Sequence, residues 1–150
     1  ASGRVGAAAG QDSPGSAAGR PATILYAEDH EVNIALVHQV VKLRPHWQLR
    51  VATNGQRALE LARCQRPDLM LVDMHLGDMS GLALAQALDA DEATRDIPRV
   101  ALSADAMPDR IQAARTHGFR AYLTKPLDVT ALLRCLDEQL ASVPTEPSAR

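Results

Sequence analysis

The stretch TILYAEDHEVNIALV, Thr23–Val37, decides the fold of this chain of 150 residues. Its apolar run Ile24–Ala27 is typical of a buried strand and leads directly into two acids, Glu28 and Asp29. No turn residue separates the run from the acids, so both charges lie where the strand leaves the core. Residues with helical spacing follow at once, which indicates a β–α unit with a negatively charged junction.

The same alternation of a short apolar run and a segment of helical periodicity continues along the chain. The predicted strands are Ile24–Ala27, Leu49–Ala52, Leu69–Val72, Val100–Leu102 and Ala121–Leu123. The predicted helices are Val32–Leu43, Gln56–Gln65, Leu82–Asp89, Asp109–His117 and Val129–Leu140. Five such units predict an α/β fold with a parallel sheet and helices on both faces, because parallel strands need crossover connections. The strands are almost wholly apolar, as expected when both faces of a sheet are buried.

The two ends of the chain differ in composition from the middle. Residues 1–22 hold five of the nine glycines and few large apolar side chains, which predicts a flexible linker. The segment SVPTEPSAR, 142–150, is polar with two prolines and predicts a disordered tail. One domain remains, at 23–141, long enough to bury a core.

Composition excludes several classes of function. A net charge of −2 gives no overall field that would attract nucleic acid or an anionic membrane, and no run approaches the roughly 18 apolar residues of a membrane span. The two cysteines, Cys64 and Cys135, lack metal-binding spacing and are expected to be buried thiols in a reducing compartment. We therefore expect a cytoplasmic domain that contacts neither nucleic acid nor membrane.

Charged and polar side chains follow four of the five predicted strands. Glu28 and Asp29 follow the first, Asp73 the third, Ser103 the fourth and Lys125 the fifth. In a parallel sheet the carboxyl ends of all strands lie at one edge, where ligands bind. Singly, each residue has a plain structural explanation, such as a helix cap, a turn cap or a solvated loop charge. Their coincidence at one edge favours a shared site.

Three carboxylates in one crevice cannot all ionise cheaply unless a cation lies with them. A hard divalent cation with oxygen ligands resolves this, and Mg²⁺ suits it because it takes one or two carboxylates and keeps water and phosphate oxygens. A carboxylate beside Mg²⁺ and a fixed lysine is arranged to attack phosphorus.

These residues resemble the response-regulator receiver domain of two-component systems over nearly all of 23–140. The resemblance rests on an acidic pair after strand one, an Asp after strand three, Ser-Ala after strand four and Lys-Pro after strand five. It implies a flavodoxin-like (βα)5 fold, doubly wound, with strand order 2-1-3-4-5. The segments EDHEVNIALV and ALSADAMPDRIQAARTHGFRAYLTKPLDV are most similar to receivers of hybrid sensor histidine kinases.

The resemblance implies the roles of the acids. Asp73 is expected to accept the phosphoryl group from a phosphohistidine of a histidine kinase or a histidine phosphotransfer protein. Asp29 and Asp73 are expected to bind Mg²⁺ directly, Glu28 through water, and His75 through its backbone carbonyl. Such a domain promotes its own phosphorylation and dephosphorylation, and its parent chain is in some cases a kinase.

It also implies a switch. Lys125 is expected to pair with the carboxylate and then with the phosphoryl group, Ser103 to bind a phosphoryl oxygen, and Tyr122 to turn inward as Ser103 moves. Added phosphate would then shift the surface formed by Asp109–His117, Ala121–Leu123 and Val129–Leu140, which is also where a homodimer is expected. A plain half-buried strand tyrosine is the alternative for Tyr122.

The sequence departs from the family pattern at several positions. His30 follows the acids where many hybrid-kinase receivers have Asn, and Gly77 replaces a common proline, which predicts a less rigid loop. His75 and Asp105 occupy positions that in the family influence how fast phosphate is lost. We expect the His75 ring to lie near the path of the attacking water and to pair with Asp105; an exposed loop histidine is the alternative.

Other classes fit the residues less well. A pseudo-receiver that is never phosphorylated would not need all five functional positions filled, as they are here. A flavin carrier needs a loop rich in Ser, Thr or Gly after strand one, where this chain has acids. A dehalogenase-type phosphatase needs a second Asp where His75 stands, and a phosphohistidine carrier needs a helical bundle. A stand-alone response regulator remains the alternative to a hybrid-kinase receiver.

Overall fold

The computed structural model describes residues 21–141 as five strands and five helices in alternation. The strands are β1 (Ala22–Ala27), β2 (Trp47–Ala52), β3 (Leu69–Asp73), β4 (Arg99–Ser103) and β5 (Phe119–Thr124). The helices are α3 (Glu31–Val41), α4 (Gly55–Cys64), α5 (Gly81–Asp89), α6 (Pro108–Thr116) and α7 (Val129–Ala141). Every predicted element is present, with ends shifted by at most two residues. The predicted linker, except for its last two residues, and the predicted tail lie outside the described residues.

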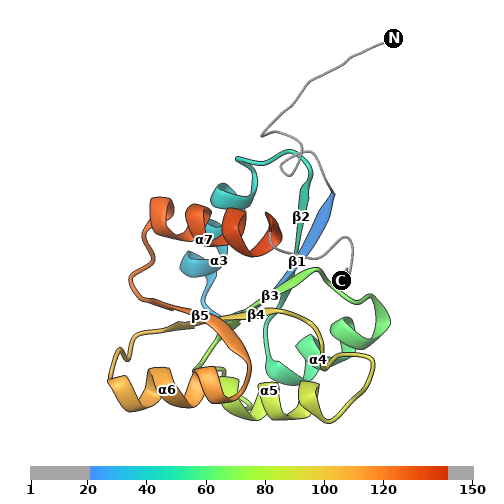
Figure 1. Ribbon diagram of the computed structural model, residues 1–150. Coiled ribbons are helices and arrows are strands. Elements are labelled where there is room, and N and C mark those ends of the chain that lie inside the picture. Colours follow the sequence, from blue (N-terminus) through green and yellow to red (C-terminus); the bar gives the residue numbers. More distant parts are fainter. Residues whose placement is uncertain (1–20, 142–150) are drawn as a thin grey trace.

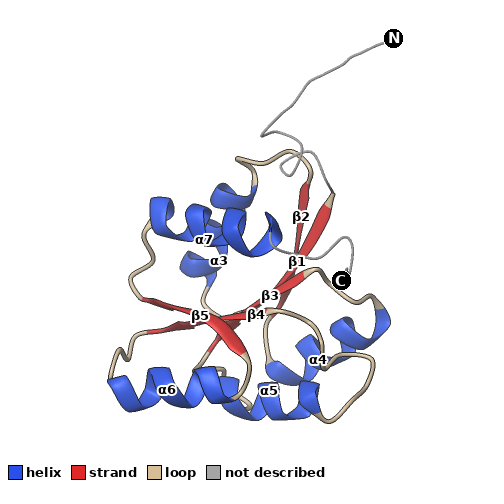
Figure 2. Cartoon of the chain, viewed as in Figure 1, coloured by secondary structure: helices blue, strands red, loops and turns tan. Residues whose placement is uncertain are grey.

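The sheet is parallel throughout, in the order β2-β1-β3-β4-β5, which confirms the predicted topology. Figure 1 and Figure 2 show α3 and α7 on one face of the sheet and α4, α5 and α6 on the other. Two hydrophobic cores result, because successive strand residues point to opposite faces. The central strand β3 is buried along its whole length, as expected for a strand covered on both sides.

The sheet brings the predicted site residues to one edge. Asp73 and Ser103 are the last residues of the adjacent strands β3 and β4, and Lys125 directly follows β5. Glu28 extends the β1 ladder by donating its backbone N–H to the Ala52 carbonyl at 2.9 Å. The positions inferred from strand ends are therefore neighbours in space.

Two details away from that edge qualify the sequence analysis. Gly118 has a φ of +87°, so it follows α6 in the left-handed conformation that glycine adopts most easily and that commonly ends a helix. Cys135 is buried, but Cys64 is exposed, which corrects the expectation of two buried thiols: it is the last residue of α4 and lies off its packed face. Among residues 21–141, none of the helices is long and apolar enough to cross a bilayer.

Arg99, on the inner strand β4, is buried at 2% exposure although it carries a charge. Its guanidinium pairs with Asp89 at 3.0 Å. It also donates hydrogen bonds to three backbone carbonyls, those of Ala85, Arg95 and Ile97. A buried charge requires such partners, and here they tie α5 and the following loop to the sheet.

Candidate functional site

Four side chains converge at the carboxyl edge of β1 and β3. Glu28, Asp29, His30 and Asp73 each offer a ligand atom, and these four atoms lie within 4.8 Å of one another. Glu28 and Asp73 are buried, while Asp29 and His30 are exposed at the mouth. The predicted convergence of the two strand-one acids with Asp73 is therefore present, and His30 joins them.

Glu28 is fixed by three partners. Its Oε1 accepts a hydrogen bond from the Tyr26 hydroxyl at 2.7 Å and pairs with Lys125 Nζ at 3.2 Å. Its Oε2 lies 3.1 Å from His30 Nδ1. Burial alone would raise the pKa of Glu28, but the hydrogen bond from the Tyr26 hydroxyl and the charge of Lys125 outweigh it and lower the pKa to about 2.

Asp73 is fixed at the end of β3 by its neighbours. Its Oδ1 accepts the His75 backbone N–H at 3.0 Å and lies 3.3 Å from Lys125 Nζ. Burial raises the pKa of Asp73, and the adjacent Glu28 carboxylate raises it further, against the opposing effect of the His75 N–H and Lys125. The two buried acids thus differ: the fold stabilises the ionised form of Glu28 and destabilises that of Asp73.

Ser103 and Tyr122 act on the same loop, which joins β4 to α6. The Ser103 hydroxyl accepts the backbone N–H of Asp105 at 3.0 Å, and the Tyr122 hydroxyl donates to the Asp105 carbonyl. The Asp105 carboxylate accepts the Met107 N–H at 3.0 Å and pairs with Arg110 Nε at 3.4 Å. Both residues predicted to act as a switch therefore hold the backbone of this loop.

His75 is exposed and lines the same cleft as Asp105. The predicted contact of its ring with Asp105 is not among the interactions of the described residues, because the Asp105 carboxylate turns toward α6 and Arg110. Arg110, not His75, is the charged partner of Asp105.

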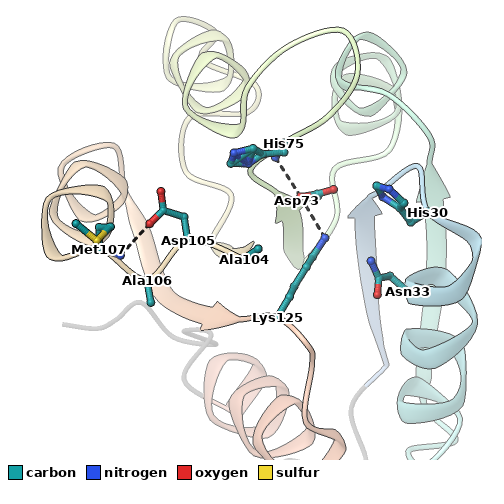
Figure 3. A pocket seen from close by; sticks show the side chains of 9 residues that line it. All are labelled: His30, Asn33, Asp73, His75, Ala104, Asp105, Ala106, Met107 and Lys125. Carbon is teal, nitrogen blue, oxygen red and sulfur yellow. Dashed lines mark hydrogen bonds and ion pairs between the residues drawn. The ribbon is translucent and has the colours of Figure 1, made fainter.

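These groups surround an open cleft with a volume of about 750 Å³. Figure 3 shows the Lys125 side chain reaching toward Asp73, with His30 on one side and His75 and Asp105 on the other. The lining residues are His30, Asn33, Asp73, His75, Ala104, Asp105, Ala106, Met107 and Lys125. A second cavity of about 240 Å³ lies behind Ser103, between Tyr122 and Arg110.

The loop between β3 and α5 is anchored to the start of α4. Both carboxylate oxygens of Asp78 accept backbone N–H groups of that helix, from Gly55 at 2.8 Å and Gln56 at 3.0 Å. Met79 packs so closely on Gly55 that a Cβ there would lie 2.4 Å from its side chain. The flexibility predicted from Gly77 is therefore countered by its neighbours.

Sequence reasoning missed three contributors to the cleft. Tyr26 was assigned to the core, yet its position two residues before Glu28 on the same strand places both side chains on one face. His30 was noted only as a departure from a pattern. Arg110 carried no signal, although its place near the start of the helix after Ser103 brings it back to Asp105.

The donor set fits a hard divalent cation beside an anion. Carboxylate oxygens of Glu28, Asp29 and Asp73 are the ligands that Mg²⁺ prefers. Lys125 and the Ser103 hydroxyl provide a positive charge and a hydrogen-bond donor for a phosphoryl group.

Comparison with protein families and curated sequences gives a consistent result. A family model described as the response regulator receiver domain matches residues 24–137. The polar-differentiation response regulator DivK of Brucella anthropi is 34% identical over 120 residues, which cover 80% of this chain and 97% of that protein. DivK of Brucella ovis is 33% identical over 118 residues, covering 79% and 95%.

Solved structures agree in fold. The receiver domain of sensor histidine kinase PA1611 from Pseudomonas aeruginosa, determined with a magnesium ion coordinated in its active-site cleft, has a TM-score of 0.73 at 27% identity. It covers 81% of this chain and 99% of its own. The chemotaxis response regulator CheY4 of Vibrio cholerae has a TM-score of 0.74 at 22% identity, covering 79% and 98%.

Proposed function

The chain belongs to the response regulator receiver domain family, and on that premise we propose that its cleft accepts a phosphoryl group on Asp73 in a Mg²⁺-dependent reaction. One observation carries the proposal. The Asp73 carboxylate is buried beside Lys125, at 3.3 Å, within the cluster of acids that suits a cation. The domain would thus serve two-component signalling as a phosphoacceptor.

The donor is a phosphohistidine of a histidine kinase or a histidine phosphotransfer protein. An oxygen of the ionised Asp73 carboxylate forms a bond to phosphorus as the phosphorus–nitrogen bond breaks. The electron pair of the broken bond returns to the donor imidazole, and an acyl phosphate results. The open mouth of the cleft, formed by exposed residues such as His30 and Met107, admits a donor side chain.

Asp29 and Asp73 would hold Mg²⁺ directly, Glu28 through water, and His75 through its backbone carbonyl. When bound, the ion would neutralise charge on the transferring oxygens. The protein's own part is to orient the groups: Tyr26 and Lys125 fix Glu28, and Lys125 also contacts Asp73.

Phosphate on Asp73 would draw Lys125 and the Ser103 hydroxyl toward its oxygens. Ser103 now accepts the Asp105 N–H, and Tyr122 donates to the Asp105 carbonyl, so a move of Ser103 would loosen the same loop. This loop leads into α6, next to β5, and the signal would spread over the α6–β5–α7 surface. A homodimer through this surface and the effect of His75 and Asp105 on phosphoryl lifetime stay predictions.

Labelling by a small phosphodonor, such as phosphoramidate, tests the proposal. We expect one base-labile phosphoryl group per chain with Mg²⁺ and little without it. Asp73→Asn should abolish labelling, while Asp105→Asn, a change of another carboxylate that lines the cleft, should retain it. Undiminished labelling of Asp73→Asn would remove Asp73 from its role. Complete failure of the wild type would favour a pseudo-receiver.

The kind of full-length protein to which this receiver domain belongs is a separate question. We predict the receiver of a hybrid sensor histidine kinase, and the PA1611 receiver is one relative of that kind. The DivK proteins, which the match covers almost completely, support the stand-alone response regulator as the alternative. The coding sequence upstream of Ala1 decides: a kinase core there is expected, and its absence would favour a stand-alone regulator.

A further inference from the structure

We propose that His30 is an additional ligand of the cation site, so that this cleft binds a late first-row transition ion, such as Zn²⁺, through an imidazole nitrogen. The inference rests on the proposed cation site and deepens it. A site made only of oxygen ligands suits Mg²⁺, whereas a nitrogen ligand adds affinity for ions that accept imidazole.

The distances around His30 support a shared ion. Its Nδ1 lies 3.0 Å from Asp29 Oδ1 and 3.1 Å from Glu28 Oε2. Two ligands that each lie about 2.1 Å from an ion are about 3.0 Å apart at the right angles of octahedral coordination and about 3.4 Å apart at the tetrahedral angle that Zn²⁺ prefers, so a small turn of the ring reaches either spacing. The spacing is also that of a hydrogen bond, so the ring is already held where a ligand would stand.

The local structure aims the ring at the cleft. His30 is the N-cap residue of α3 in an extended conformation, with φ −93° and ψ 120°, and its side chain makes no cap hydrogen bond. Its backbone N–H is instead directed to Glu28 Oε2 at 3.3 Å. Figure 3 shows the ring at the rim of the cleft, on the side of Asp73 opposite His75.

The chemistry of the donor set completes the argument. With an ion bound, the neutral tautomer with its proton on Nε2 would direct the Nδ1 lone pair at the ion, in place of the Nδ1–H that hydrogen-bonds the carboxylates without one. The ring is 68% exposed, so it can turn by the small amount that coordination needs. Glu28 and Asp73, both buried, supply the negative charge that a divalent ion requires. His30 therefore adds selectivity among cations whose charge is the same.

Affinities for Mg²⁺ and Zn²⁺ should be measured by calorimetry on three proteins: wild type, His30→Asn and His38→Asn. The last is the control, because His38 is an exposed histidine of α3 that does not line the cleft. We expect His30→Asn to weaken Zn²⁺ binding at least about tenfold and to leave Mg²⁺ binding nearly unchanged. In the wild type, the ¹⁵N resonance of His30 Nδ1 should shift with Zn²⁺ and not with Mg²⁺.

Equal Zn²⁺ affinity of the wild type and His30→Asn would overturn the inference, since the ion would then bind elsewhere on the surface. So would an equal loss of Zn²⁺ and Mg²⁺ affinity, which would indicate damage to the whole cleft. Mg²⁺-dependent labelling of His30→Asn separates this inference from the proposed function. If His30→Asn is still labelled and its Zn²⁺ selectivity equals that of the wild type, only the role of His30 as a ligand is refuted. If the wild type itself is not labelled, the phosphoacceptor role of Asp73 is refuted.

Discussion

Replacing Tyr26 by Phe removes one hydroxyl from a buried position and leaves the ring in place. That hydroxyl donates to Glu28 Oε1 at 2.7 Å, and both side chains are fully buried. A hydrogen bond to a charged group contributes about 1.5–3 kcal/mol, so the free energy of unfolding should fall by about that amount. For a domain of this size the Tm should fall by roughly 5–15 °C.

The same bond is the chief favourable influence on the Glu28 carboxylate, which gives the prediction a pH signature. The pKa of Glu28 is lowered from 4.5 to about 2 in the folded protein, so its stabilising effect is complete above pH 4.5 and is lost as the pH falls toward 2. Without the Tyr26 hydroxyl the pKa should rise by about one to two units. The stability difference between wild type and Tyr26→Phe should therefore narrow below pH 4.5.

Urea unfolding at neutral and acidic pH, in metal-free buffer, measures this difference. Tyr122→Phe is the matched control, because the other tyrosine of the chain donates to a backbone carbonyl and not to a carboxylate. The difference in the free energy of unfolding between wild type and Tyr122→Phe should not change over the same pH range. Equal stabilities of wild type and Tyr26→Phe at neutral pH would refute the assigned role of the hydroxyl. So would a difference in the free energy of unfolding that stays the same at acidic pH.

Three further predictions concern the fold around the cleft. Arg99→Met should lower stability by about 3 kcal/mol. Three backbone carbonyls lose a charged donor at about 1.5–3 kcal/mol each, and removal of a buried charge offsets part of that loss. Arg95→Met, at an exposed position, should cost little, and equal effects of the two substitutions would contradict this. Asp78→Ala should cost about 1 kcal/mol, because the Gly55 and Gln56 N–H groups at the start of α4 lose their carboxylate acceptor while the Asn54 cap remains. The Gly55 N–H is the main cause of the lowered pKa of Asp78, so its contribution should fade below pH 3.8 in denaturant titrations. Asp73→Asn should raise the Tm in metal-free buffer near neutral pH. Burial raises the pKa of Asp73, so its ionised carboxylate destabilises the fold above that pKa. An unchanged Tm would contradict this destabilising effect of the charge.

The fold followed from the sequence because its pattern is redundant. Each strand is a short apolar run between helical segments, and parallel connectivity leaves few arrangements. The site followed from a single geometric rule: the carboxyl ends of parallel strands share an edge, so Asp73, Ser103 and Lys125 had to be neighbours once their strands were recognised. No side-chain conformation was needed for that step.

What the sequence did not reveal depends on side-chain direction. The His75–Asp105 pair was a plausible match of charge, but the Met107 N–H and Arg110, at the start of α6, are the partners that the Asp105 carboxylate takes. Asp78 resembles any loop aspartate in sequence. Its role depends on how the loop after β3 folds back on the start of α4, a long-range contact with no local signal.

The two buried acids of the cleft, Glu28 and Asp73, carry more negative charge than the cation beside them neutralises. Lys125 is the one ammonium in contact with both buried acids among residues 21–141, at 3.2 Å from Glu28 and 3.3 Å from Asp73. One positive charge cannot neutralise two carboxylates, and Tyr26 and His30 favour Glu28, so the remaining cost falls on Asp73. The residue proposed to attack phosphorus is thus the one whose negative charge the fold stabilises least. Any cation that enters the cleft relieves that cost. Bonding of the same oxygen to phosphorus removes the charge of the carboxylate but brings the negative charge of the phosphoryl group, which the cation and Lys125 would have to offset. The proposed cation binding and the proposed phosphoryl transfer are therefore coupled through the negative charge at Asp73.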